Sequence, residues 1–239
     1  MSNNNLVLIS GESATGKSAC LRNIPNPEGV MYLCTEAGKK LPFKSKFKEA
    51  NVIDPLQVTE AITQAETMPE IHTIVIDSLT FLLDQFETQY VLGTANTMKG
   101  WQEFQQFFKR MLQQYVAAST KNIIFTAHTQ TILNEADMAM ETKVPVKGAL
   151  KANGIEAYFS LVISTKKMTT KSLEKYSSDL LNITEEEKTL GFKYVLQTKL
   201  TKETVNERIR APMGMFINNE TFIDNDIQLI LDKVHAYYE

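Results

Sequence analysis

Short apolar runs alternate with longer amphipathic segments through the first half of the chain. The apolar runs end at polar or glycine-containing turns, as buried strands do. Between them, apolar residues recur at helical spacing, and Asp54 followed by Pro55 predicts the start of a helix. The expected strands cover residues 6–9, 30–34, 73–77 and 122–127, and the expected helices cover 54–67, 78–90 and 100–119. This alternation predicts an α/β domain whose mostly parallel central sheet is flanked by helices.

The last third of the chain follows a different pattern. Residues 158–165 and 192–199 read as strands separated by a polar stretch, and 213–217 is a further candidate strand. Asp224 is a candidate N-cap for a final helix that runs to Tyr238. No internal repeat or linker divides the chain, so residues 1–239 are expected to form a single domain with additional C-terminal strands and a terminal helix.

Composition excludes several classes of protein. The 239 residues are 43% hydrophobic and 22% charged with a net charge of −3, which is typical of a globular protein. There is no apolar run of the roughly 18 residues that a membrane span needs, and the first residues lack the features of a signal peptide. We therefore expect a cytoplasmic protein, in the host cytoplasm if a phage encodes it. Cys20 and Cys34 are expected to be core thiols, and the lysine-rich segments 143–151, 166–175 and 193–210 to be solvated surfaces.

A phosphate-binding motif follows the first expected strand. The sequence matches the pattern G-x-x-x-x-G-K-[ST] in full. Glycines let backbone N–H groups turn inward around phosphate oxygens, and a helix that follows adds the positive end of its dipole. Lys17 reaches the β- and γ-phosphates, and the Ser18 hydroxyl binds Mg²⁺. The motif consists of Gly11, Glu12, Ser13, Ala14, Thr15, Gly16, Lys17 and Ser18. It predicts a site for a nucleoside triphosphate, ATP with Mg²⁺.

Two carboxylates are candidates for the rest of this site. Asp77 ends an apolar strand, where P-loop proteins hold Mg²⁺ through water; the alternative is a helix cap. Many P-loop ATPases carry a glutamate directly after that aspartate, but this chain has Ser78 there. Glu36, two residues beyond the strand that ends at Cys34, is therefore the best candidate for the catalytic base. The alternative is a glutamate in a surface loop.

His128 directly follows the expected strand 122–127. A polar side chain at the carboxyl end of this strand could contact the γ-phosphate and report hydrolysis to the loop that follows. A purely structural histidine is the alternative, and Gln130 is a second candidate for the same task.

Together, these motifs resemble the RecA-like core of P-loop ATPases. The resemblance extends over most of residues 6–217, and the segments occur in the family's order. Where His128 stands, the family usually has glutamine. Besides the phosphate loop, the similar segments are 32–37 (the strand before the catalytic glutamate), 74–79 (the magnesium strand), 123–128 (the sensor strand), 147–151 with 159–164 (the end of the second DNA loop and its next strand) and 206–213 (the basic segment that reaches a neighbouring subunit's ATP).

Within that group, the short length and the run from Glu207 to Phe216 resemble phage nucleotide-binding proteins that pair a RecA core with single-strand annealing. The resemblance implies a DNA-stimulated ATPase that acts on single-stranded DNA in annealing or strand exchange. It also implies self-association into a ring or filament, and a single-strand-binding protein as a partner. Arg208, or alternatively Arg210, would then approach the γ-phosphate bound to the next subunit.

The DNA-binding loops of the family correspond to residues 90–101 and 132–147. Lys99 and Trp101 lie in the first, and Lys143 and Lys147 in the second. Lysines bind the backbone of a single strand, and aromatic rings stack under its bases. We expect these four residues to contact DNA, with core packing as the alternative for Trp101.

Three other functions use the same phosphate loop. One is an ATP-dependent helicase, or a helicase-loading or replication adaptor ATPase without recombinase activity, and another is a small-molecule kinase. The third is a module that holds ATP without turnover.

Overall fold

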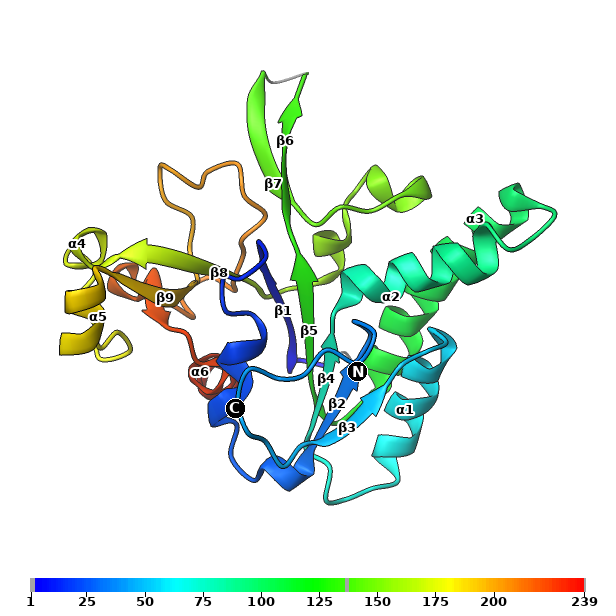
Figure 1. Cartoon of the computed structure of the whole chain (residues 1–239), viewed down its shortest axis with the longest axis horizontal. Coiled ribbons are helices and arrows are strands. Elements are labelled where there is room, and N and C mark those ends of the chain that lie inside the picture. Colours follow the sequence, from blue (N-terminus) through cyan, green and yellow to red (C-terminus); the bar gives the residue numbers. More distant parts are fainter. Residues whose placement is uncertain (1–2, 136–137, 239) are drawn as a thin grey trace.

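In the computed structural model, which describes residues 3–135 and 138–238, a single large sheet runs through the centre of the molecule (Figure 1). Within these residues it has eight strands in the order β10-β9-β8-β1-β5-β4-β2-β3. In this order, each pair of neighbours between β8 and β3 is parallel. β9 runs antiparallel to β8, and β10 runs antiparallel to β9. The strands are β1 (Leu6–Gly11), β2 (Val30–Cys34), β3 (Lys48–Asn51), β4 (Thr73–Asp77), β5 (Asn122–His128), β8 (Val162–Thr169), β9 (Phe192–Gln197) and β10 (Phe222–Asp224). The predicted α/β fold with a mostly parallel sheet is confirmed.

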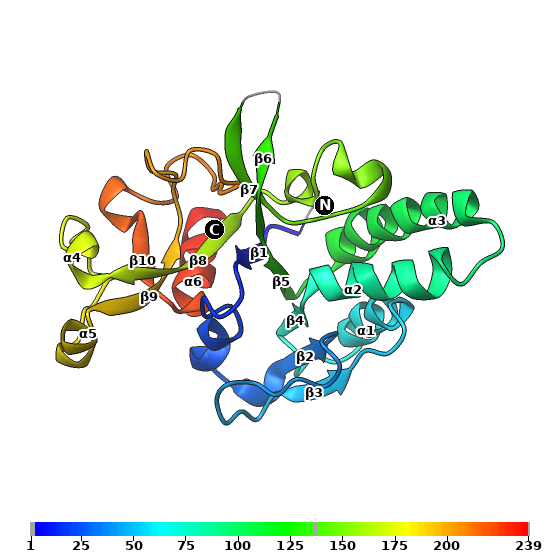
Figure 2. The ribbon, with the colours of Figure 1, turned by 45° about the horizontal axis from the view of Figure 1, so that its top comes forward.

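Alternate residues of the central strands face two separate cores. On β4, Ile74 and Ile76 pack with α1, α2 and α3, whereas Val75 faces the core that contains α6. Because successive side chains of a strand point to opposite faces, an apolar strand needs cover on both sides. Figure 2 shows α1, α2 and α3 together on one side of the strands. The helices are α1 (Leu56–Glu66), α2 (Leu79–Phe86), α3 (Thr97–Arg110), α4 (Thr170–Leu173), α5 (Glu185–Leu190) and α6 (Ile227–Tyr238). In the part of the chain that the structure describes, no helix has the length and apolar character needed to cross a membrane.

The helix expected directly after the phosphate motif is only a 3₁₀ helix, Ser18–Asn23. Pro25 and Pro27 follow at once. A residue that precedes a proline is driven away from helical backbone angles, so the segment cannot continue as an α-helix. The helix dipole expected at the phosphate motif is therefore supplied by only one short helical segment.

Several strand bounds differ from the sequence prediction. The strand expected at 158–165 begins at Val162, because Ile155–Tyr158 forms a 3₁₀ helix. The strand expected at 213–217 does not form, and the outermost strand is β10 instead. β3 was not predicted, because its four residues are all exposed and carry no apolar pattern.

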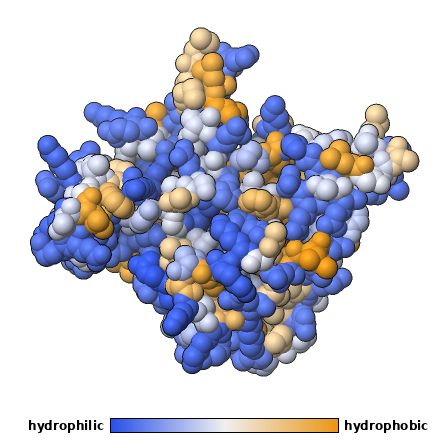
Figure 3. All heavy atoms as spheres, viewed as in Figure 1, coloured by the Kyte–Doolittle hydropathy of each residue, from blue (hydrophilic) through white to orange (hydrophobic). Residues whose placement is uncertain are grey.

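The segment expected to be a loop after His128 is largely a β-hairpin. β6 (Gln130–Asn134) pairs antiparallel with β7 (Ala139–Lys143), and residues 136–137 lie outside the described residues. The hairpin projects away from the sheet (Figure 1). Leu133 and Met140 face each other across its two strands and are 52% and 54% exposed. Figure 3 shows apolar side chains on this projection.

Candidate functional site

The phosphate motif forms a tight turn between β1 and the 3₁₀ helix. Gly16 has a φ of +98° and Ala14 a φ of +60°, both in the left-handed region. A side chain at Gly16 would be strained, since L-residues avoid this region. At Gly11 the reason for glycine is different: a Cβ there would lie 2.2 Å from Oγ1 of Thr165 on β8. The two glycines of the motif are thus required by backbone conformation and by close packing, respectively.

Lys17 is buried inside this turn, with 6% of its surface exposed. Its Nζ donates hydrogen bonds to the carbonyl oxygens of Gly11 (3.0 Å) and Glu12 (2.7 Å). Burial lowers the pKa of the Lys17 ammonium to about 8, although the nearby Asp77 and Glu36 carboxylates act in the opposite direction. The turn therefore encloses a positive charge that is held by two backbone carbonyl groups.

Asp77, at the end of β4, accepts hydrogen bonds from three hydroxyl groups. Its Oδ2 accepts from Ser18 Oγ and from Tyr32 Oη, both at 2.7 Å. Its Oδ1 accepts from Thr126 Oγ1 at 2.5 Å. Ser18 and Asp77, each expected from the sequence to hold Mg²⁺, thus lie within hydrogen-bond distance of each other. The sequence does not predict the roles of Tyr32 and Thr126, although each is a buried side chain with a hydroxyl group in a strand next to β4.

The oxygens around Asp77 fit a magnesium ion. Mg²⁺ prefers hard oxygen ligands, and in nucleotide sites it takes one or two protein ligands and completes its shell with phosphate oxygens and water. Ser18 Oγ and Asp77 Oδ2 supply such a hydroxyl and carboxylate pair. The Ser78 hydroxyl beside them is buried and has no hydrogen-bond partner among the described residues.

Glu36 and His128 meet at the carboxyl edge of the sheet. β4 lies between their strands, β2 and β5, and Glu36 Oε1 is 3.0 Å from His128 Nε2. Lys39 Nζ donates to the other oxygen of Glu36 at 2.6 Å. The hydrogen bond from His128, together with that from Lys39, holds the pKa of Glu36 at about 2. Glu36 is therefore ionised at neutral pH and can only accept, so His128 Nε2 carries the proton of their hydrogen bond.

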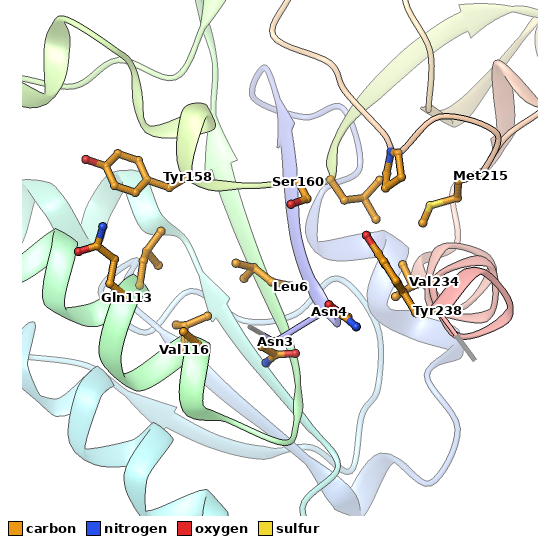
Figure 4. A pocket seen from close by; sticks show the side chains of 14 residues that line it. Asn3, Asn4, Leu6, Gln113, Val116, Tyr158, Ser160, Met215, Val234 and Tyr238 are labelled. Carbon is orange, nitrogen blue, oxygen red and sulfur yellow. The ribbon is translucent and has the colours of Figure 1, made fainter. Parts of the chain in front are cut away.

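A cavity of about 390 Å³ opens between the phosphate motif and this edge of the sheet. Five motif residues line it, together with Glu36, Lys39, Pro42, His128 and Tyr194. A second cavity, of about 210 Å³, lies at the opposite end of β1, where Leu6, Val116, Tyr158 and Val234 line it (Figure 4). It contains none of the predicted site residues. The first cavity is the candidate functional site because it brings the phosphate motif together with Glu36 and His128.

Further contacts that the sequence did not predict hold the phosphate turn in place. Thr15 Oγ1 is 2.6 Å from Thr165 Oγ1 on β8. Asn225, between β10 and α6, donates from Nδ2 to the carbonyl oxygen of Gly16 at 3.0 Å. These residues are 150 and 209 positions away from their partners, and no local pattern marks them.

Arg208 lies outside the lining of this cavity. Its guanidinium forms an ion pair with Glu141 on β7, and Nε donates to Glu141 Oε1 at 2.9 Å. The backbone N–H of Thr142 donates to the carbonyl oxygen of Asn206 at 3.1 Å. Within one chain, then, the Arg208 segment is attached to the hairpin rather than to the phosphate motif.

The four residues expected to contact DNA are spread over α3 and the hairpin region. Each lysine forms an ion pair within the chain: Lys99 with Glu103 (3.6 Å), Lys143 with Glu141 (2.7 Å) and Lys147 with Glu87 (2.7 Å). The Trp101 ring packs edge-on against Phe104, with ring centroids 5.4 Å apart. A Cβ on Gly148 would lie 2.9 Å from the same indole, so Trp101 contributes to packing.

Comparison with known proteins agrees with this geometry. A family model described as an AAA domain matches residues 3–205. The matched region contains the phosphate motif, Glu36, Asp77 and His128, whereas Arg208, Asn225 and α6 lie beyond it. Among curated proteins no match was found.

Proposed function

This chain belongs to the AAA-domain family of P-loop ATPases, and we propose that it hydrolyses ATP with Mg²⁺ in the 390 Å³ cavity. We propose further that its nucleotide state controls annealing or strand exchange of single-stranded DNA. The observation that carries the proposal is the link between His128 and the hairpin. His128 ends β5 beside Glu36, and β6 begins two residues later at Gln130. A change at the γ-phosphate can therefore reach the hairpin through a single connecting residue.

In this proposal the cavity residues divide the work of hydrolysis. Lys17 and the backbone N–H groups of the motif bind the phosphates, and Ser18 and Asp77 hold Mg²⁺, which neutralises charge that develops on the phosphate oxygens. Glu36 orients the attacking water and accepts its proton. Electrostatic stabilisation by fixed groups such as Lys17 is the main source of rate in phosphoryl transfer.

His128 serves in this proposal as the sensor of the γ-phosphate. Its Nε2 proton now points to Glu36, and a phosphate oxygen is a competing acceptor of the same kind. When His128 turns to the phosphate, the start of β6 shifts with it, since Thr129 alone separates the two. The hairpin is then the element with two arrangements that the nucleotide biases.

The experiment that tests this function is ATP hydrolysis with and without single-stranded DNA. We expect hydrolysis to be stimulated by single strands, less by duplex DNA, and to vanish in Lys17→Ala in both cases. Hydrolysis that depends on Lys17 but is indifferent to DNA contradicts the recombination function and leaves the ATPase assignment intact.

One observation favours a second candidate function, an ATP-dependent adaptor in helicase loading or replication. The projecting end of the hairpin presents the apolar pair Leu133 and Met140 rather than lysines. Exposed apolar surface on a projection is typical of protein contacts. In that case the nucleotide would control a protein partner, and DNA would not change the rate of hydrolysis.

We further propose that the protein self-associates, so that Arg208 of one subunit approaches the nucleotide of the next. Arg208 is 43% exposed at its side chain, and its partner Glu141 also binds Lys143, so the ion pair can exchange. An arginine supplied by a neighbour stabilises the charge of the transferring phosphoryl group.

Arg208→Ala is expected to lower hydrolysis about 10³-fold and to leave ATP binding unchanged, because Arg208 does not line the cavity of its own chain. The decisive measurement is the rate of ATP hydrolysis by a mixture of the Arg208→Ala and Glu36→Gln variants. In mixed assemblies, an intact Glu36 site can receive an intact Arg208 from the other variant, so activity should return. If the two inactive variants stay inactive when mixed although they co-assemble, Arg208 does not act between subunits.

A further inference from the structure

Tyr194 lines the candidate cavity but has no role in the phosphate chemistry proposed above. It lies on β9, is 38% exposed and lines the same cavity as Lys17 and Glu36. Its ring reaches the phosphate turn: a Cβ on Gly16 would lie 3.6 Å from Tyr194 Cδ1. The side chain is thus an aromatic surface directly beside the phosphate motif.

The ring of Tyr194 is held in place by its neighbours on the sheet. Phe192 packs against it edge-on, with centroids 5.8 Å apart. Lys167 is the cross-strand partner of Tyr194 on β8, and its Nζ lies 3.9 Å from the Phe192 centroid and 6.0 Å from that of Tyr194. Such aromatic and cation–π contacts fix the orientation of a ring. A ring fixed before binding loses little entropy when a ligand stacks on it.

The order of the strands gives the cavity a direction. The phosphate motif follows β1, and Glu36 follows β2, three strands away on one side. Tyr194 is on β9, two strands away on the other side. Figure 2 shows β2 and β9 on opposite sides of β1. A triphosphate whose last phosphate faces Glu36 and His128 must therefore extend its nucleoside away from them, toward Tyr194.

The turn between these two ends is tied to the C-terminal part of the chain. Asn225 donates to the carbonyl oxygen of Gly16 and is 5% exposed. Its Nδ2 would lie 2.6 Å from a Cβ on Gly16, so Asn225 and the Tyr194 ring both border the space beside this glycine. Asn225 lies beyond the matched residues 3–205, so this support is a feature of this chain rather than of the family model.

We propose that Tyr194 is the nucleobase-binding residue of this site, with Asn225 as the positioning residue that keeps Gly16 against the ring. The inference rests on the proposed function, since it assigns the nucleoside end of the same nucleotide site. Stacking uses the face of a base rather than its hydrogen-bonding edge. Tyr194 therefore favours purine over pyrimidine triphosphates through the larger ring, and distinguishes adenine from guanine little.

The test compares two ligands that differ only in the nucleoside. Affinities of Mg-ATP and of Mg-tripolyphosphate are measured by calorimetry for the wild type, Tyr194→Ala and Tyr194→Phe. We expect Tyr194→Ala to weaken ATP binding about tenfold and to leave tripolyphosphate binding unchanged, whereas Tyr194→Phe keeps both. Tyr115→Ala is the matched control, because Tyr115 is also 38% exposed and does not line the cavity.

Two results overturn the assignment of Tyr194 without affecting the proposed function. In one, Tyr194→Ala binds ATP as the wild type does. In the other, it loses both ligands equally, which means that the ring only supports the phosphate turn. A wild type that binds neither ligand overturns the nucleotide site itself, and the Tyr194 proposal with it.

Discussion

Replacing Glu36 with glutamine is expected to reduce the turnover of ATP about 10³-fold while the affinity for Mg-ATP stays within a few-fold of the wild type. Glutamine keeps the size of the side chain but cannot accept a proton from water. The structure also indicates that the basicity of Glu36 would depend on its partners: with hydrogen bonds from His128 and from Lys39, the pKa of Glu36 is only about 2. A carboxylate held so low is a weak base, and we expect bound phosphate to draw one of these partners away.

Single-turnover hydrolysis and equilibrium nucleotide binding, measured on the same preparation, separate these effects. Glu28→Gln is the matched control, because Glu28 also accepts from a lysine, Lys46 at 2.9 Å, but lies outside the cavity. Turnover by Glu36→Gln at the wild-type rate means that the base is elsewhere or that hydrolysis is not the function.

The parts of the site that the sequence predicts are those that a parallel sheet brings together. Glu36 and His128 are 92 positions apart, but Glu36 lies two residues beyond β2 and His128 is the last residue of β5, and the carboxyl ends of parallel strands share one edge. Their proximity can therefore be expected once the two apolar runs are read as parallel strands of one sheet. Ser18 and Asp77 are likewise close together, and they were selected as candidates from a local motif and a strand end.

The parts that the sequence does not predict depend on antiparallel pairing and on long-range contacts. Tyr194 reaches the cavity only because β9 returns beside β8 in a particular register, and a shift by one residue would turn its side chain to the other face. The hairpin at 130–143 has apolar residues that do not alternate strictly with polar ones, so it reads as a loop. Asn225 meets Gly16 across 209 positions.

Lys17→Ala is expected to weaken Mg-ATP binding about 100-fold and to reduce hydrolysis to background. The variant removes the buried cation between the Gly11 and Glu12 carbonyl groups. Because burial of this charge is itself costly, as the lowered pKa shows, we expect its loss not to destabilise the fold, and thermal unfolding checks this. Lys44→Ala is the control, since it removes an exposed lysine that does not line the cavity. ATP binding at wild-type strength in Lys17→Ala contradicts the phosphate-binding role of the motif.

The pKa of Lys17 also predicts that nucleotide binding becomes coupled to a proton. In the free protein this pKa is about 8, and a bound phosphate must raise it, because an anion favours the charged amine. Below about pH 8 Lys17 is protonated in both states, so it adds no pH dependence. Above that value the free protein has lost the proton, so binding takes one up, and the affinity falls by at most about tenfold per pH unit. Calorimetry in two buffers of different ionisation enthalpy, at about pH 7 and about pH 9, measures this uptake. If no proton is taken up at the higher pH, the Lys17 ammonium does not contact the phosphates.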